Sequence, residues 1–235
     1  MTESEWLEWT DPGWMLEHLL QGEATQRKLR LFVIACCRRI WSRMIDARSR
    51  HAVELAERSA DEPLSDEELD AASASAEEAW EDSLTDDEGE AVVAHDPRRN
   101  AAAAASYASS PGMLGAEHFG VVLGGASVAS PVGAGQENAA QAAILRELFG
   151  NPFRPLPPLG PAVLAWQNGL VTRLALAAYE ERAMPAGTLG PERLAVLADG
   201  LLDAGCDDGD LLAHLRSPGP HVRGCHVVDW VLGRQ

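Results

Sequence analysis

The stretch that most constrains the fold is 26–44, with the sequence QRKLRLFVIACCRRIWSRM. Its large apolar residues recur at spacings of three and four positions, which is the period of one face of an α-helix. They are Leu29, Phe32, Val33, Cys36, Cys37, Ile40, Trp41 and Met44. Further apolar residues at 31, 34 and 35 widen this face. The stretch therefore predicts a core helix that runs on to about Arg48 and that other elements enclose.

The composition favours helices over sheets. The chain has 235 residues, of which 46% are hydrophobic and only 6% are aromatic. Alanine is abundant and has the highest intrinsic helix propensity, whereas aromatic and β-branched residues are the ones enriched in strands. A chain of this length forms one domain or two small ones. We expect an all-α fold, an irregular orthogonal array of about eight to ten helices.

Changes of composition divide the chain into three parts. Residues 1–108 form an N-terminal helical half with an acidic segment at 54–96, in which Ser65 and Glu68 have the form of a capping box. Residues 109–135 are rich in Gly and Ala, and we expect a linker or an insertion there. Residues 136–235 form a C-terminal helical half, with a proline-rich, extended connector at 151–161.

Charge argues against a nucleic-acid partner. The formal net charge is −17 and the isoelectric point is near 4.7, whereas binding to phosphates requires a basic surface. Basic residues concentrate at 27–50, which holds eight Arg or Lys and one acid. These side chains could face an anionic partner, but we favour internal ion pairs with the acidic segment. That segment can also be a solvated face, or can engage a basic partner protein.

The sequence predicts a cytoplasmic protein with reduced thiols. No apolar run reaches the roughly 18 residues that a membrane span needs. The first residues, MTESEWLEWTD, are acidic where a signal peptide is basic and then apolar. Cys36 and Cys37 are neighbours and cannot pair with each other without severe strain, and Cys206 and Cys225 are too few for a disulfide framework.

Four strings carry a resemblance to a known family. They are EWLEWTDP near the start, RKLRLFVIACCRRIW in the predicted core helix, LFGNPFRP before the connector and PGPHVRGCHVVDWVLG near the end. With these strings the chain resembles an uncharacterised bacterial family that is expanded in planctomycetes. The match covers roughly 1–58 and 137–235, and the acidic and Gly-rich middle is the variable part. The resemblance implies a shared architecture and transfers no activity and no catalytic residue.

The C-terminal region contains the main candidate for a site. Six residues with metal-binding or titratable side chains fall within 24 positions: Cys206, His214, His221, Cys225, His226 and Asp229. If a helix begins near His221, then residues 221, 225 and 229 lie one turn apart on one face. Thiolate and imidazole ligands suggest zinc, with Cys206, His214, His221 and Cys225 as the candidate ligands.

Two other interpretations of the same residues stay open. The chain lacks the CxxC and HExxH motifs of well-defined zinc sites, so both cysteines can equally be small buried residues, with His221 packed beside Pro220. An activated Cys–His pair is a further hypothesis. Cys225 and His226 are sequence neighbours, however, and on a helix they point about 100° apart. The CDDGD run at 206–210 lacks the ligands of a calcium loop and is better explained as a helix cap.

No motif commits the chain to a reaction. We therefore expect a non-catalytic, cytoplasmic helical module for protein interaction or regulation, whose partner is another protein. One alternative is a small metal-dependent or cysteine-dependent enzyme that uses the C-terminal Cys/His cluster. The other is an interaction module with a structural zinc site. A bound metal separates both alternatives from the first hypothesis, and an open coordination position separates an enzyme from a structural site.

Overall fold

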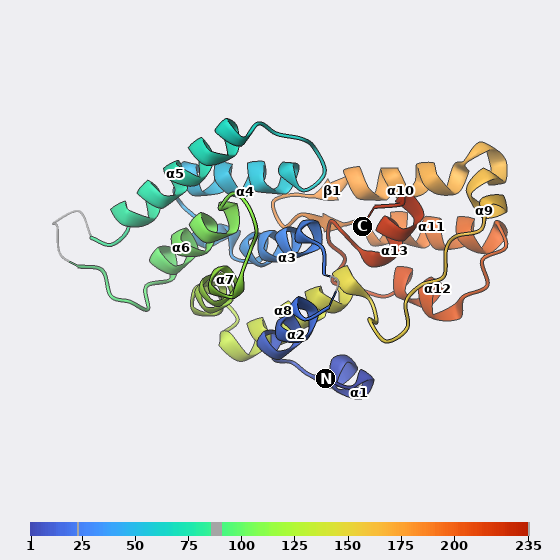
Figure 1. Cartoon of the computed structure of the whole chain (residues 1–235), viewed down its shortest axis with the longest axis horizontal. Helices are drawn as coiled ribbons and strands as arrows, with labels where there is room; N and C mark the ends of the chain where they lie inside the picture. The colour runs from blue at the N-terminus through green and yellow to red at the C-terminus, as the bar shows by residue number, and fades with distance from the viewer. Residues whose placement is uncertain (23, 86–90, 235) are drawn as a thin grey trace. The chain divides into compact units, whose positions relative to one another are not determined.

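The computed structural model of the chain describes residues 1–22, 24–85 and 91–234 (Figure 1). In these residues thirteen α-helices, two short 3₁₀-helices and one two-stranded sheet are present. The predicted all-α class is confirmed, although the helices outnumber the eight to ten that we expected. Among the described helices, none is both long enough and apolar enough to cross a membrane.

The contacts within the chain define two compact units, which do not coincide with the predicted parts. Unit 1 consists of residues 1–8 and 143–235, and unit 2 of residues 9–142. The first eight residues therefore belong with the C-terminal part of the chain, and the predicted 109–135 segment lies wholly inside unit 2. The two units share one helix, α8 (Ala134–Phe149), because the division falls between its residues 142 and 143.

Unit 2 is built around the predicted core helix. Its elements are α2 (Pro12–Leu20), α3 (Gln26–Arg39), η1 (Trp41–Arg43), α4 (Ala47–Ser59), α5 (Asp66–Asp82), α6 (Pro97–Ser109), α7 (Ala116–Ala129) and the first part of α8. The helix α3 begins at the Thr25 cap, buries ten of its residues and packs against α4, α6 and α7. In Figure 1, α4, α5 and α6 lie side by side. The capping box of Ser65 and Glu68 starts α5, as predicted.

The core helix is shorter than predicted, because α3 ends at Arg39 and a 3₁₀ turn follows. The Ile40 amide turns back to the Cys37 carbonyl, at 3.2 Å. The Trp41 ring is half-buried and is not a core residue. Instead the guanidinium groups of Arg38 and Arg50 lie 4.4 Å and 5.6 Å from its ring centroid. Cation–π contacts of this kind hold the ring at the edge of the core.

The Gly-rich segment 109–135, expected to be a linker or an insertion, contains the packed helix α7. Phe119, Val122, Ala126 and Ala129 recur on one face of α7 and are buried. Small residues bring this face close to α6, where a Cβ atom on Gly125 would lie only 2.7 Å from the Asn100 carbonyl oxygen. Glycine here allows two helices to approach closely and does not make the chain flexible. Composition alone does not distinguish these two roles of glycine.

The basic residues of 27–50 make internal ion pairs, as we favoured. Pairs to acids of the predicted acidic segment are Arg27–Asp61, Arg38–Glu57 and Arg48–Asp82, each at 2.7 Å, and Arg48 also lies 3.9 Å from Glu78. Another pair joins Arg39 to Glu137 of α8, outside that segment, at 2.8 Å. Residues 86–90 of the acidic segment lie outside the described residues.

Unit 1 has its own core. Its elements are α1 (Glu3–Glu8), the last part of α8, α9 (Pro161–Ala165), η2 (Trp166–Asn168), α10 (Leu170–Glu180), β1 (Arg182–Ala183), β2 (Thr188–Leu189), α11 (Pro191–Asp203), α12 (Gly209–Leu215) and α13 (His226–Leu232). The helices α10 and α11 lie side by side (Figure 1) and are joined by the β1–β2 hairpin. Buried apolar residues of α10 to α13 form one cluster. Of the predicted connector 151–161, residues 151–160 have no helix, and Pro161 begins α9.

The N-terminus is fixed in unit 1 through Trp6. Its side chain is fully buried. The indole Nε1 donates a hydrogen bond to the Gly150 carbonyl at 2.9 Å, and Arg146 Nε donates one to the Trp6 carbonyl at 2.7 Å. The helix α1 is thereby bonded to the C-terminal end of α8, next to the candidate site described below.

Candidate metal centre

Unit 1 brings together four side chains that can ligate a metal: Glu147, His214, His221 and Cys225. One ligand atom from each of them lies within 4.8 Å of the others. His214, His221 and Cys225 are three of the four ligands proposed from the sequence. The fourth member is Glu147, from a helix 67 positions before His214, and the spacing of residues gave no signal for it.

Two of the four side chains project from helix ends. Glu147 is in the last turn of α8, and Gly150 ends that helix with a φ of +64°. A Cβ atom on Gly150 would lie 2.7 Å from Cδ2 of His226, so a glycine is needed there for both the turn and the packing. His214 is in the last turn of α12, which starts at the side-chain cap of Asp208.

The other two side chains come from the chain before α13, not from a shared helix face. The helix α13 begins at His226, and Cys225 is the residue that caps it. His221 lies in an extended segment whose carbonyl accepts the Leu189 amide at 2.9 Å. The conditional prediction that residues 221, 225 and 229 share one helix face is therefore wrong. A turn at 222–225, and not helical spacing, brings His221 and Cys225 together.

The remaining sequence candidates have other places. Cys206 follows α11 and packs, half-buried, against the apolar cluster of unit 1. It is absent from the group of ligand atoms found in the part of the chain that the structure describes. Asp229 is buried within α13. His226 lies beside the group, where its Nδ1 donates to the Glu147 carbonyl at 2.9 Å and its ring centroid is 4.4 Å from that of His214.

Three distances within the group are close to the edges of a tetrahedral zinc site. His221 Nδ1 and His214 Nε2 each lie 3.2 Å from a carboxylate oxygen of Glu147. His214 Nε2 also lies 3.4 Å from Cys225 Sγ. When a zinc ion has bonds of about 2.0 to 2.3 Å, its tetrahedral ligand atoms lie about 3.3 to 3.8 Å apart. These three contacts are therefore compatible with a tetrahedral site, and all four atoms lie within 4.8 Å of one another.

The contacts of His221 are also compatible with a bound metal ion. Its Nε2 lies 3.0 Å from the Ser217 carbonyl, which can only accept, so Nε2 carries a hydrogen. In the neutral ring, Nδ1 then presents a lone pair to the Glu147 carboxylate, and two acceptors face each other. Either a second proton on Nδ1 or a metal ion between the two groups resolves this conflict. Metal-bound histidines usually donate their other N–H to a carbonyl or carboxylate in this manner.

The metal-free group is a buried charge network. Burial alone would raise the pKa of Glu147, but hydrogen bonds from His214 and His221 outweigh it and hold that pKa well below its usual range. Burial opposes the charged form of His221, and the hydrogen bond and charge of Glu147 outweigh it and raise the pKa of His221. Burial, followed by the nearby Glu147 charge, raises the pKa of the Cys225 thiol well above its ordinary value.

The geometry does not support a cysteine nucleophile. A catalytic Cys–His–acid arrangement needs the thiol at one imidazole nitrogen and the carboxylate at the other. Here Cys225 and Glu147 both contact the same atom, Nε2 of His214. The Cys225 side chain is also fully buried, and the raised pKa of its thiol opposes the reactive thiolate. What the arrangement can do is bind a metal ion.

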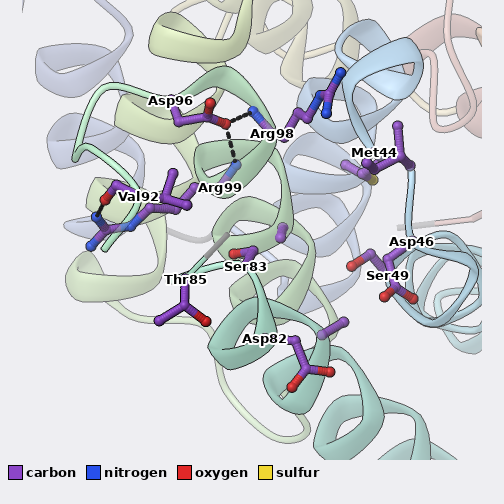
Figure 2. Close-up of a pocket in the computed structure, with 13 residues that line it drawn as sticks. Met44, Asp46, Ser49, Asp82, Ser83, Thr85, Val92, Asp96, Arg98 and Arg99 are labelled. Atoms are coloured by element: carbon purple, nitrogen blue, oxygen red, sulfur yellow. Dashed lines mark hydrogen bonds between the residues drawn. The ribbon is translucent and has the colours of Figure 1, made fainter. Parts of the chain in front are cut away.

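Unit 2 contains a hollow between α4, α5 and α6 (Figure 2). It has a volume of about 390 Å³. Most of its polar groups are already paired: Asp46 and Asp82 bind Arg48, and Asp96 caps α6 by accepting the amides of residues 98 and 99. Among the residues that the structure describes, the buried Ser49 hydroxyl has no hydrogen-bond partner. One such group does not define a ligand, so the hollow carries no functional assignment.

Comparisons with known proteins add no functional information. No protein-family model matches the chain, and neither a curated protein nor a solved structure is similar to it. The resemblance to the planctomycete family therefore stays an expectation. Any assignment of function has to come from the side chains themselves, and the group formed by Glu147, His214, His221 and Cys225 is the strongest basis for one.

Proposed function

We propose that this chain is a non-catalytic helical module whose unit 1 is held by a structural zinc ion, and that its partner is another protein. The proposed ligands are Glu147, His214, His221 and Cys225. One observation carries the zinc site, namely that four ligand atoms from three separate regions of the sequence lie within 4.8 Å of one another. Three of these residues are at most 4% exposed.

Zinc fits this set of donors better than the other common metals. Calcium and magnesium prefer oxygen ligands, whereas two imidazoles and a thiolate are ligands that zinc prefers. The Glu147 carboxylate and the Cys225 thiolate together supply two negative charges, which neutralise a divalent ion inside the protein. This matters because a buried charge without a partner costs several kcal/mol or more.

A structural role follows from the number of ligands. Structural zinc sites are usually closed by four protein ligands, whereas catalytic sites have three and keep a fourth position for water or substrate. Here four protein atoms converge. They come from α8, α12 and the chain before α13, so an ion would tie these segments together. For a partner, the exposed acids of α5 offer a charged surface, because its alanines 72, 76 and 79 face inward.

Elemental analysis tests the zinc site. Full-length protein, purified without a metal-binding tag or chelator and dialysed against trace zinc, is expected to contain about one zinc per chain. The Cys225→Ser and His221→Ala variants should lose it. Cys206→Ser and His51→Ala are the matched controls, since residue 206 lies outside the group and His51 is exposed on α4 in unit 2.

Two results would contradict the proposal. Wild-type protein that takes up no zinc even from micromolar solution would leave the group as a buried Glu–His ion pair beside an ordinary thiol. Zinc that is retained in Cys225→Ser but lost in Cys206→Ser would place the metal at a different site.

A further inference from the structure

We infer that His214 is the exchangeable ligand of the proposed zinc site, the one position at which the metal enters and leaves and at which a small external nitrogen or sulfur donor binds. This inference rests on the proposed zinc site and adds to it. It assigns three residues as a permanent anchor, Glu147, His221 and Cys225, and gives the fourth coordination position a separate role.

Exposure is the first observation that separates His214 from the other three ligands. The side chain of His214 is 22% exposed, compared with 2% for each of Glu147 and His221, and Cys225 is completely buried. Solvent therefore reaches the group from the side of His214. A metal ion or a small ligand arriving from solution meets this ring first.

The second observation is the way each ligand is held. Nε2 of His221 donates to the Ser217 carbonyl at 3.0 Å, and the main chain at Glu147 is held because its carbonyl accepts a hydrogen bond from His226 at 2.9 Å. His214 has no such support: within the described residues, its Nδ1 makes no hydrogen bond, and both of its polar contacts use Nε2. Outer hydrogen bonds fix the orientation of metal-bound imidazoles, so a ring without one is freer to leave.

The third observation is the packing of the His214 ring. It contacts two other imidazoles, with ring centroids 5.1 Å from His221 and 4.4 Å from His226. The place that the His214 ring fills next to them is a slot of the size of an imidazole. Removing the His214 side chain would leave that slot open to solvent on one side. A free imidazole molecule matches the lost ring in shape and in its nitrogen donor.

Charge also permits the exchange. The two anionic ligands, Glu147 and Cys225, are among the three anchored residues. If the His214 ring leaves, a divalent ion is still neutralised by them, and a neutral donor can take the open position without burying a net charge. If Glu147 or Cys225 left instead, part of the positive charge of the buried ion would lack compensation.

The test measures how fast zinc moves from the full-length protein to a chromogenic chelator. In His214→Ala, about one zinc per chain should remain bound, and its release should be at least about tenfold faster than in wild type, since even the loss of an outer-sphere contact costs 10–100-fold in affinity. Millimolar imidazole should return the release rate of this variant toward the wild-type value. His51→Ala, with an exposed histidine removed from unit 2, should match wild type with and without imidazole.

His221→Ala provides the contrast, because its slot is closed to solvent. This variant should lose zinc, and imidazole should not restore it. A second variant, His214→Gln, keeps a side chain beside the two neighbouring rings and so controls for disturbed packing in the alanine variant. It should also release zinc quickly.

The results separate this inference from the zinc proposal itself. Absence of zinc from wild type would reject the proposed site. Zinc in wild type together with slow release from His214→Ala and His214→Gln would overturn only the exchangeable role. Complete loss of zinc from both variants without any effect of imidazole would do the same, since His214 would then be as essential as His221.

Discussion

At the scale of single residues, the best-defined electrostatic contact of unit 2 is the ion pair of Arg38 and Glu57. The two side chains are only 3% and 6% exposed, and Arg38 Nη2 lies 2.7 Å from the carboxylate. Arg38 also contacts the Trp41 ring. Removing one partner of a buried pair leaves the other charge without compensation, which is much more costly than losing an exposed pair.

Glu57→Ala is therefore expected to lower the free energy of unfolding of unit 2 by about 3–5 kcal/mol. The matched change is Glu62→Ala, which removes the pair of Arg58 and Glu62, whose side chains are 53% and 55% exposed. That loss should be below about 0.5 kcal/mol. Urea unfolding of both variants measures the difference. Equal small losses would show that Arg38 reaches solvent when its partner is removed.

The four cysteines should differ in their reactivity. Burial, followed by the nearby Cys37 and Glu137, raises the pKa of Cys36, and burial raises that of Cys37 to about 12. Cys225 is likewise buried, with a raised pKa, and only Cys206 is partly exposed. Since the thiolate is the reactive form, we expect Ellman's reagent to modify one thiol quickly in the native protein.

That fast phase should disappear in Cys206→Ser and remain in Cys225→Ser. All four thiols should react quickly once the protein is unfolded in guanidinium. A fast phase of two or more thiols in native wild-type protein would contradict the burial of the other cysteines.

At the scale of elements, the contact of α6 with α7 shows how a Gly-rich and Ala-rich sequence builds a core. The side chains that meet are small: a Cβ atom on Gly125 would lie 3.4 Å from the Ala104 Cβ and 2.7 Å from the Asn100 carbonyl oxygen. Elsewhere on the same helix, a Cβ atom added to Gly120 or Gly124 would meet no neighbouring atom within 4 Å. Three glycines of one helix therefore have two different roles.

Gly125→Ala should destabilise unit 2 by about 1–3 kcal/mol, the usual cost of overpacking. Gly120→Ala should leave stability unchanged or raise it by up to about 1 kcal/mol, because alanine favours the helix and meets no neighbour. Thermal unfolding followed by circular dichroism compares the two. A destabilisation of the same size in both variants would mean that the close approach of α6 and α7 is not what Gly125 provides.

The same elements show what the sequence predicts well. Local signals were reliable: the apolar period of α3, the capping box of α5 and the prolines of 151–161 all act over a few residues. Differences between expectation and structure arose where tertiary contacts decide. Two arginines hold Trp41 outside the core helix, and packing against α6 makes a helix of a segment whose composition is that of a linker.

At the scale of the whole molecule, the same distinction explains the site. His214, His221 and Cys225 lie within 12 positions, and their side-chain types and closeness in the sequence made them candidates. Glu147 was missed because the fold, not the sequence, brings the end of α8 to them. The limits of the two units were missed for a related reason. The first eight residues join the C-terminal unit through Trp6 and Gly150, which are 144 positions apart.

The division into two units makes a final prediction about metal removal. All four proposed ligands belong to unit 1, so zinc should stabilise that unit alone. A ligand at 1,000 times its dissociation constant adds about 4 kcal/mol to stability. Chelation should therefore speed up hydrogen exchange of the most protected amides of unit 1, by up to about a thousandfold where they exchange through unfolding of that unit.

Hydrogen exchange followed by mass spectrometry of the full chain resolves the two units by their peptides. Peptides from 150–234 should lose protection on chelation, whereas peptides from 24–85 should not change. Cys225→Ser should show the chelated pattern before any chelator is added, and Cys206→Ser should respond like wild type. A loss of protection spread equally over both sets of peptides would mean that the metal stabilises the chain as one cooperative body, because a ligand confined to unit 1 acts on unit 2 only if the two unfold together.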